Sequence, residues 1–238
     1  LLTYNNSKLV ELDITNSQPY FSLPIITKEY INMFPEIDKS VINKRLQGYY
    51  HAVLSGTLYE IFGKKLKREL GNDILEKYVN DNQKLRKIIQ KGNGNKKGKC
   101  YGAFGYRPKY TGRKKWIPED LRGKDDRTII KSIVFQIYYG EVKSAKKYKR
   151  VFRKLFPEVL EVIHKIKKEG RNFAVELQKA ESDAILGKVC KVIKAKNRRI
   201  PLFTVHDSIL TTEEHVKKVK CIMKREIKKL TGFPVKIK

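Results

Sequence analysis

Residues 126–140 read DRTIIKSIVFQIYYG, and this stretch determines how the rest of the chain is interpreted. Within it, Arg127, Lys131, Phe135 and Tyr139 follow one another at intervals of four residues. On an α-helix each interval advances by about 400°, so the four side chains share one side and the isoleucines between them can be buried. Arginine and lysine pair with phosphate oxygens, and aromatic rings stack on a base or sugar. This helix could hold a nucleoside triphosphate lengthwise, although an amphipathic helix with a basic edge and core aromatics has the same pattern.

The composition favours a polyanionic partner. The 238 residues include 53 Lys and Arg against 25 Asp and Glu, a formal charge of +28. Nucleic acid is the simplest such partner; a basic protein without one is the alternative. The sequence contains no long uncharged apolar run, so it predicts no membrane-spanning helix. Three widely separated cysteines indicate reduced thiols and an intracellular location, in the cytoplasm or nucleoid, which is compatible with a gene carried by a phage or another mobile element.

A carboxylate precedes the central helix in the sequence. Residues 8–13 (KLVELD) alternate as a strand does and end at Asp13, after which ITNSQPYFS turns the chain. A carboxylate at a strand end is well placed to bind a metal ion, because its neighbours are buried and its head group is not. The alternative is an aspartate that caps the next helix.

A second carboxylate follows the central helix. Residues 199–212 (RIPLFTVHDSILTT) predict a strand, a tight turn and a strand, with His206, Asp207 and Ser208 at the tip. A turn aspartate that bonds its own backbone is the alternative.

Most of the remaining chain is expected to be helical. The helix expected at 171–195 carries Gln178 and Glu181 beside its apolar stripe. Aromatic, basic and glycine residues alternate at 101–116, which suits stacking on a nucleic acid strand or, equally, a solvated hairpin. The expected helices cover 27–90, 156–167, 171–195 and 213–230.

Together the three motifs resemble family A DNA polymerases. The central stretch is similar to their motif B, R-x3-K-x3-F-x3-Y-G, and V-H-D at 205–207 resembles motif C. The segment after Asp13 resembles motif A but departs from it, since the Asp-x-Ser-Gln of the family is here Asp-Ile-Thr-Asn-Ser-Gln and places Gln18 where the family usually has Glu. Single-subunit RNA polymerases share most of motif B, usually with Met in place of Phe135, and usually have Ser after the motif C aspartate, as Ser208 is here.

The resemblance implies an α+β fold: a polymerase right-hand palm, with a small antiparallel sheet backed by helices, and a mostly helical fingers insertion. The implied boundaries are palm at 1–60, fingers at 61–155 and palm again at 156–238. A thumb is expected from a longer parent chain.

The resemblance also implies a two-metal site. Asp13, Asp207 and the backbone carbonyl of Ile14 would hold two Mg²⁺ ions, for which Mn²⁺ could substitute. Lys131 would act catalytically on the leaving group, and Arg127 would bind the phosphates beside it.

Further contacts to the substrates are implied by the same likeness. Phe135 and Tyr139 would pack on the base and sugar, and Gln18 would check the sugar 2′ position. Gln178 and His206 would meet the template–primer duplex. The expected function is template-directed DNA synthesis from dNTPs; a single-subunit RNA polymerase and a catalytically silent nucleic-acid-binding module are the alternatives.

Overall fold

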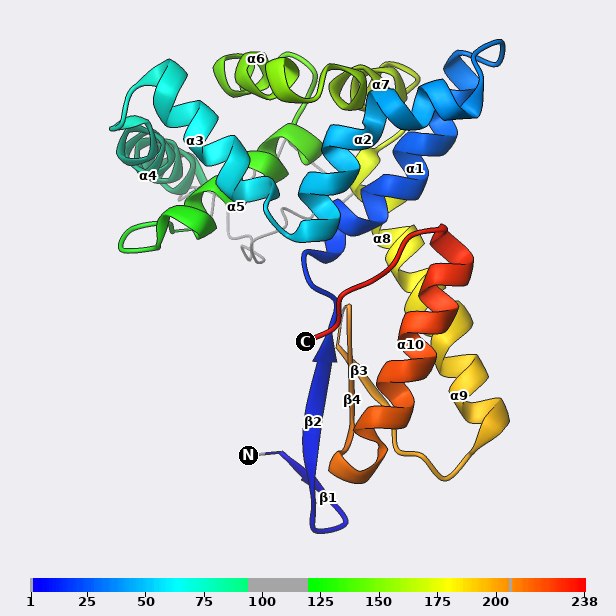
Figure 1. Cartoon of the computed structure of the whole chain (residues 1–238). Coiled ribbons are helices and arrows are strands. Elements are labelled where there is room, and N and C mark those ends of the chain that lie inside the picture. Colours follow the sequence, from blue (N-terminus) through cyan, green and yellow to red (C-terminus); the bar gives the residue numbers. More distant parts are fainter. Residues whose placement is uncertain (1, 94–119, 206) are drawn as a thin grey trace. The chain divides into compact units, whose positions relative to one another are not determined.

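The computed structural model describes residues 2–93, 120–205 and 207–238, and the statements below concern these residues. The fold is mostly helical α+β, with a small antiparallel sheet of four strands (Figure 1). The chain divides into two compact units. The first contains residues 1–58 and 136–238, and the second contains residues 59–135.

The sheet lies in the first unit and has the strand order β1-β2-β4-β3. Strand β2 pairs with β4 in a register that sets Leu12 opposite Ile209 and Asp13 opposite Ser208. Leu12 is 2% exposed, whereas the residues before it are partly solvated, as expected for a strand with one covered face. The strands are β1 (Thr3–Tyr4), β2 (Ser7–Asp13), β3 (Phe203–Val205) and β4 (Ser208–Thr212).

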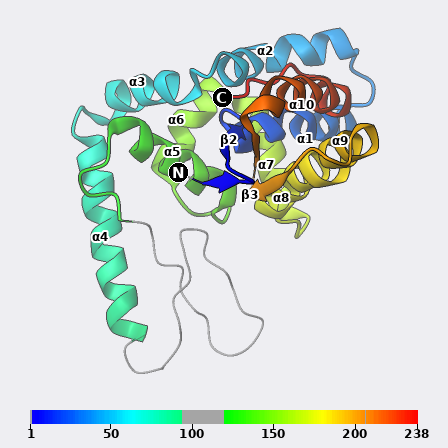
Figure 2. The same cartoon turned by 90° about the horizontal axis from the view of Figure 1, so that it is seen from below.

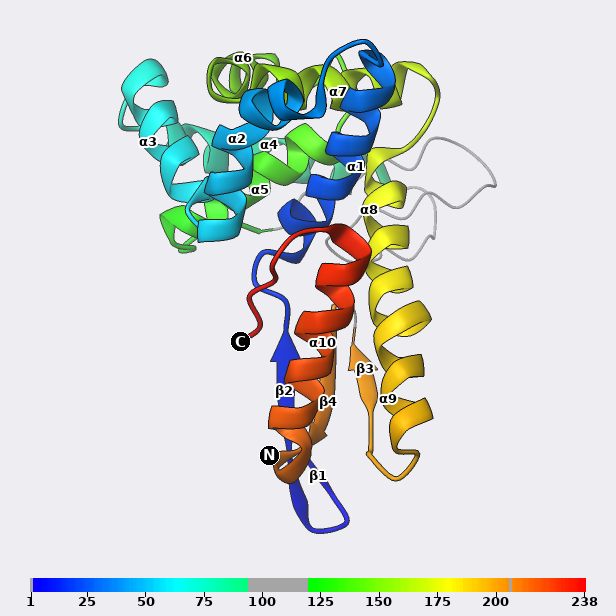
Figure 3. The same ribbon diagram turned by 45° about the vertical axis from the view of Figure 1, so that its right-hand side comes forward.

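Two helical segments back this sheet. Helix α10 (Val216–Thr231) contacts β2 and β4 and packs along the π-helical segment η1 (Asp183–Cys190). Figure 3 shows α10 running beside the continuous segment made by α8 (Phe173–Ser182), η1 and α9 (Lys191–Lys196). Val219, Met223 and Ile227 follow one side of α10 at intervals of four and are fully buried, so α10 forms because its apolar stripe is covered.

Helix α1 (Ser17–Met33) is at the centre of the first unit. It contacts α2 (Lys39–Ser55), α7 (Pro157–Lys168) and α8, and its Phe21, Leu23 and Ile26 have no exposed surface. Residues on several sides of α1 are buried because helices cover it on several sides. Helix α6 (Lys146–Leu155) and the short 3-10 helix η2 (Glu213–His215) complete this unit.

The second unit contains α3 (Leu58–Leu70), α4 (Ile74–Asn93) and most of α5 (Asp126–Tyr139). Helix α4 turns away from the direction of α3 (Figure 2). The end of the Ile130 side chain on α5 lies directly over Gly63 of α3. A larger residue at position 63 would require the Ile130 side chain to move.

Three expectations about local structure require correction. Helix α1 begins at Ser17 rather than at residue 27, because the segment after Asp13 turns within Thr15 and Asn16. The helix expected at 171–195 contains a π-helical stretch at 183–190. The first hairpin strand covers only 203–205, since residues 197–202 form no strand. The aromatic and basic stretch at 101–116 lies outside the described residues.

Candidate functional site

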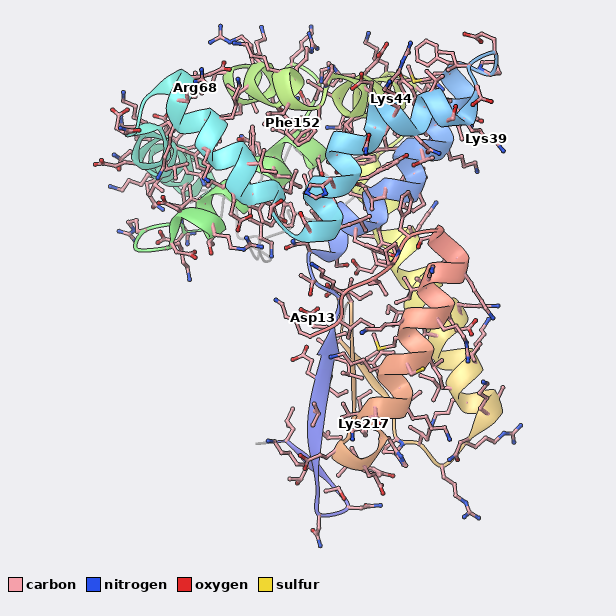
Figure 4. All side chains as sticks on the ribbon, in the orientation of Figure 1. Asp13, Lys39, Lys44, Arg68, Phe152 and Lys217 are labelled. Carbon is pink, nitrogen blue, oxygen red and sulfur yellow. The ribbon has the colours of Figure 1, made fainter. Side chains whose placement is uncertain are left out.

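The two sequence-predicted carboxylates meet in the first unit. Asp13 is the last residue of β2, and Figure 4 shows it at that end of the strand. Asp207 stands in the turn between β3 and β4, directly before Ser208, the residue that pairs with Asp13. The Asp207 carboxyl group is within hydrogen-bonding reach of the Asp13 carboxyl group. Both side chains are half-buried, so they remain accessible to a ligand.

The electrostatics of this pair disfavour two negative charges. Burial raises the pKa of Asp13 above its ordinary value, and the neighbouring Asp207 raises it further. The Lys238 ammonium opposes this rise in pKa, but the net direction is upward. Either a bound cation or a shared proton would relieve the repulsion.

The C-terminal segment fixes the end of β2. The amide of Lys238 donates to the carbonyl of Asp13 at 2.9 Å, and the amide of Thr15 donates to the carbonyl of Lys236 at 3.0 Å. Backbone groups of successive residues in an antiparallel ladder point to opposite sides. The Ile14 carbonyl is therefore directed to the side of β4, the strand that Asp207 directly precedes.

A chain of hydrogen bonds begins a few residues after Asp13, at the start of α1. The Tyr139 hydroxyl donates to Oε1 of Gln18 at 2.9 Å. Nε2 of Gln18 donates to Oε2 of Glu181 at 2.6 Å, and the Ser17 hydroxyl donates to the same oxygen at 2.7 Å. Glu181 thus sits at the positive end of α1, where backbone N–H groups favour a negative charge. The structure therefore joins Gln18 and Tyr139 and adds Glu181 to them.

Two further sequence-predicted residues, Arg127 and Lys131, lie in the second unit. Arg127 is bonded to Glu60 and lies over the Tyr59 ring, 5.0 Å from its centroid. The Lys131 ammonium lies 5.4 Å from the centroid of the Phe135 ring, which shows that these residues share one side of α5. Both cations are exposed, but Arg127 would have to exchange its carboxylate partner to bind a phosphate.

The C-terminal end of α5, which belongs to the first unit, is held by a half-buried lysine, Lys167. Nζ of Lys167 donates to the carbonyls of Ile137 and Gly140 at 2.8 and 2.7 Å. Gly140 is required by space, since a Cβ there would lie 2.5 Å from the carbonyl oxygen of Gln136. These contacts fix the turn of helix that carries Tyr139.

The duplex contacts predicted from the sequence are less defined. Gln178 is exposed on α8, one turn before Glu181, so its side chain is accessible to a partner. His206 lies outside the described residues.

Sequence reasoning assigned no role to Glu181, Glu60 or Lys167. The sequence does place Glu181 three residues after Gln178, so both lie on one side of the helix. For Glu60 and Lys167 no pattern in the sequence indicates the contact.

Within residues 2–93, 120–205 and 207–238, no three His, Cys, Asp or Glu side chains gather into a metal cage. No helix in that part of the chain is long and apolar enough to cross a bilayer. Comparisons of the chain with protein families, with curated proteins and with solved structures each found no significant match.

Proposed function

We propose that the chain catalyses template-directed nucleotide transfer as a family A-like DNA polymerase that uses two metal ions. The observation that carries this proposal is the meeting of Asp13, at the end of β2, with Asp207, in the adjoining hairpin turn. Two aspartates on neighbouring strands of a small antiparallel sheet are the arrangement that motifs A and C predict. In this proposal the first unit is the palm, and the second unit belongs to the fingers.

The donor set fits magnesium. Mg²⁺ in phosphoryl-transfer sites is held by one or two carboxylates together with substrate phosphates and water, so it does not need a closed protein cage. Asp13 and Asp207 supply carboxylate oxygens at one accessible strand end, and the carbonyl beside them belongs to Ile14, which is 1% exposed. When bound, the ions would activate the primer 3′-hydroxyl and neutralise the triphosphate. The mutual repulsion of the carboxylates supports a cation at this position.

The hydrogen bond between Tyr139 and Gln18 supports a sugar-binding role for both residues. It joins the end of the motif B helix to the segment after Asp13, so the sugar contact and the metal ligand Asp13 come from one short stretch of chain. An uncharged glutamine keeps the length of the usual glutamate, so it still occupies space that a 2′-hydroxyl would need. Arg127 and Lys131 remain the predicted phosphate contacts on the evidence of the sequence alone.

Primer extension tests the proposal. The purified chain is incubated with Mg²⁺, a DNA template–primer duplex and either dNTPs or rNTPs, and Asp207→Asn is assayed in parallel. Template-dependent addition of dNTPs that the substitution abolishes is the expected result. A preference for rNTPs would favour the RNA polymerase alternative. Duplex binding without addition of either nucleotide would favour the catalytically silent module.

The identity of Ser208 does not separate the two polymerase readings. Its hydroxyl donates to the carbonyl of Val205 at 2.8 Å and closes the hairpin turn, and its side chain is buried. This serine is explained by the turn itself, whichever nucleotide is used.

A further inference from the structure

Glu181 holds one end of the Gln18 side chain. Its Oε2 accepts from Nε2 of Gln18 at 2.6 Å and from the Ser17 hydroxyl at 2.7 Å. The two donors are adjacent at the start of α1, whereas Glu181 comes from α8, 163 positions away from Gln18 in the sequence. The contact is partly buried, which strengthens a hydrogen bond to a charged group.

The charge on Glu181 decides which way the Gln18 amide faces. A carboxylate only accepts hydrogen bonds, whereas an amide has one accepting and one donating end. If the amide turned over, Oε1 would face the carboxylate and two accepting oxygens would lie at hydrogen-bonding distance. Nε2 must therefore face Glu181, and Oε1 must face Tyr139.

The direction of the second hydrogen bond follows from the first. Because Oε1 of Gln18 accepts, the hydroxyl proton of Tyr139 must point toward it, as the 2.9 Å contact has it. Glu181 thereby orients Tyr139 through Gln18. We use the name relay for these three residues, Glu181, Gln18 and Tyr139.

We infer that Glu181 is a positioning residue that sets the sugar selectivity of the site, an inference that rests on the proposed function. With the amide held at both ends, Gln18 cannot move aside for a ribose 2′-hydroxyl. One N–H of its NH₂ group is bonded to Glu181, which fixes the plane of the amide, so the second N–H cannot turn toward that hydroxyl. The relay therefore disfavours ribonucleotides by holding the Gln18 side chain in one place and one orientation, although Gln18 itself is neutral.

Replacing Glu181 by glutamine tests the orientation directly. A glutamine of the same size can donate or accept, so the Gln18 amide becomes free to turn over. We expect the ratio of kcat/KM for dNTP to that for rNTP to fall by about 3- to 10-fold in Glu181→Gln, mainly through a lower KM for rNTP. Glu181→Ala, which removes the contact altogether, should lower the ratio at least as far.

The control is Glu176→Gln on the same helix. Glu176 pairs with Arg171 at 3.3 Å and has no contact with Gln18, so the ratio should stay at the unmodified value. A purely structural role for Glu181 would lower kcat/KM for both nucleotides equally and leave the ratio unchanged. That result would overturn the inference.

A second measurement separates this inference from the proposed function. Glu181 and Tyr139 are connected through Gln18, so their substitutions should be coupled in a double-mutant cycle of Glu181→Gln and Tyr139→Phe followed by urea unfolding. We expect the change in the unfolding equilibrium constant to depart from the product of the single changes by about 2-fold or more. Coupling without nucleotide addition would support the relay and remove the polymerase assignment. If nucleotides were added, but the two substitutions acted independently and the ratio of kcat/KM for dNTP to that for rNTP did not change, the relay would be excluded and the polymerase assignment would stand.

Discussion

The carboxyl groups of Asp13 and Asp207 lie within hydrogen-bonding reach of each other, although one ends β2 and the other stands in the β3–β4 turn. Their proximity follows from the register of the sheet, which sets Asp13 opposite Ser208. Two consequences of this pairing can be measured, one for activity and one for stability.

The first prediction concerns activity. Asp207→Asn should reduce nucleotide addition by at least about 10³-fold, because an amide is a poor ligand for Mg²⁺. The affinity for a template–primer duplex should change less than about 2-fold, because under the proposed function a chain with a charge of +28 would bind the duplex mainly through phosphate contacts. Primer extension and fluorescence anisotropy at fixed salt measure the two effects. Glu36→Gln, which removes an exposed charge from the loop after α1, should leave both unchanged, and activity in Asp207→Asn would exclude Asp207 as a metal ligand.

The second prediction concerns stability without metal. The pKa of Asp13 is raised by burial and by Asp207, so the ionised carboxyl group destabilises the folded protein wherever the pH exceeds that pKa. Asp13→Asn should therefore stabilise the protein in EDTA at pH 8 by on the order of 0.5 kcal/mol, a small gain because solvent screens half-buried charges.

The gain in stability from Asp13→Asn should disappear as the pH falls through the raised pKa, since the unmodified carboxyl group is then neutral in the folded state. Urea unfolding at pH 8 and pH 4 measures the change. Added Mg²⁺ should stabilise the unmodified chain more than the variant. A loss of stability at pH 8 in EDTA would show that the pair is not repulsive.

The third prediction concerns the sugar. We expect a real but modest preference for dNTPs over rNTPs, and Gln18→Ala should reduce it by about 10-fold because space opens beside Tyr139. Competition assays that give kcat/KM for each nucleotide measure the preference. Gln47→Ala, at an exposed position of α2, serves as the control. If selectivity did not change in Gln18→Ala, the residue that checks the sugar would lie elsewhere, and Gln18 would not correspond to the glutamate of motif A.

The sequence was sufficient to predict elements whose pattern is local. The period of four in the central stretch predicts α5, and the alternation around VHD predicts the hairpin that places Asp207 at its turn. Strand β2 also follows from its alternation. These elements could be predicted because backbone periodicity and turn chemistry depend on residues a few positions apart.

Contacts between distant residues could not be predicted in this way. The bond from Gln18 to Glu181 joins positions 163 apart, and the bond from Arg127 to Glu60 joins positions 67 apart. Neither partner is part of a motif, because any exposed glutamate has the same local pattern. The start of α1 at Ser17, rather than at residue 27, also does not follow from the periodicity of the sequence. Asn16 adopts a left-handed conformation with φ 54°, which ends the turn after Asp13 and lets Ser17 begin the helix.

The last prediction concerns the end of α5 that carries Tyr139. Burial, reinforced by the charge of Lys149, lowers the pKa of Lys167 to about 7 from its ordinary value of 10.5. Between pH 7 and pH 10.5 Lys167 is protonated in the unfolded chain but not in the folded chain. The free energy of unfolding therefore rises with pH across this range, and below pH 7 Lys167 does not make it depend on pH. Lys167→Met should abolish that contribution.

The Met variant should also be less stable by about 1–3 kcal/mol at pH 7, because the carbonyls of Ile137 and Gly140 lose their donor. Its deficit relative to the unmodified chain should then grow between pH 7 and pH 10, since only the unmodified chain gains stability from the titration of Lys167. Urea unfolding at pH 6, 7, 8.5 and 10 measures this difference. Lys168→Met, at the exposed neighbouring position, should show no growing deficit. A deficit of the same size at every pH would mean that Lys167 stays charged in the folded protein, and that the two carbonyls at the end of α5 outweigh the effect of burial.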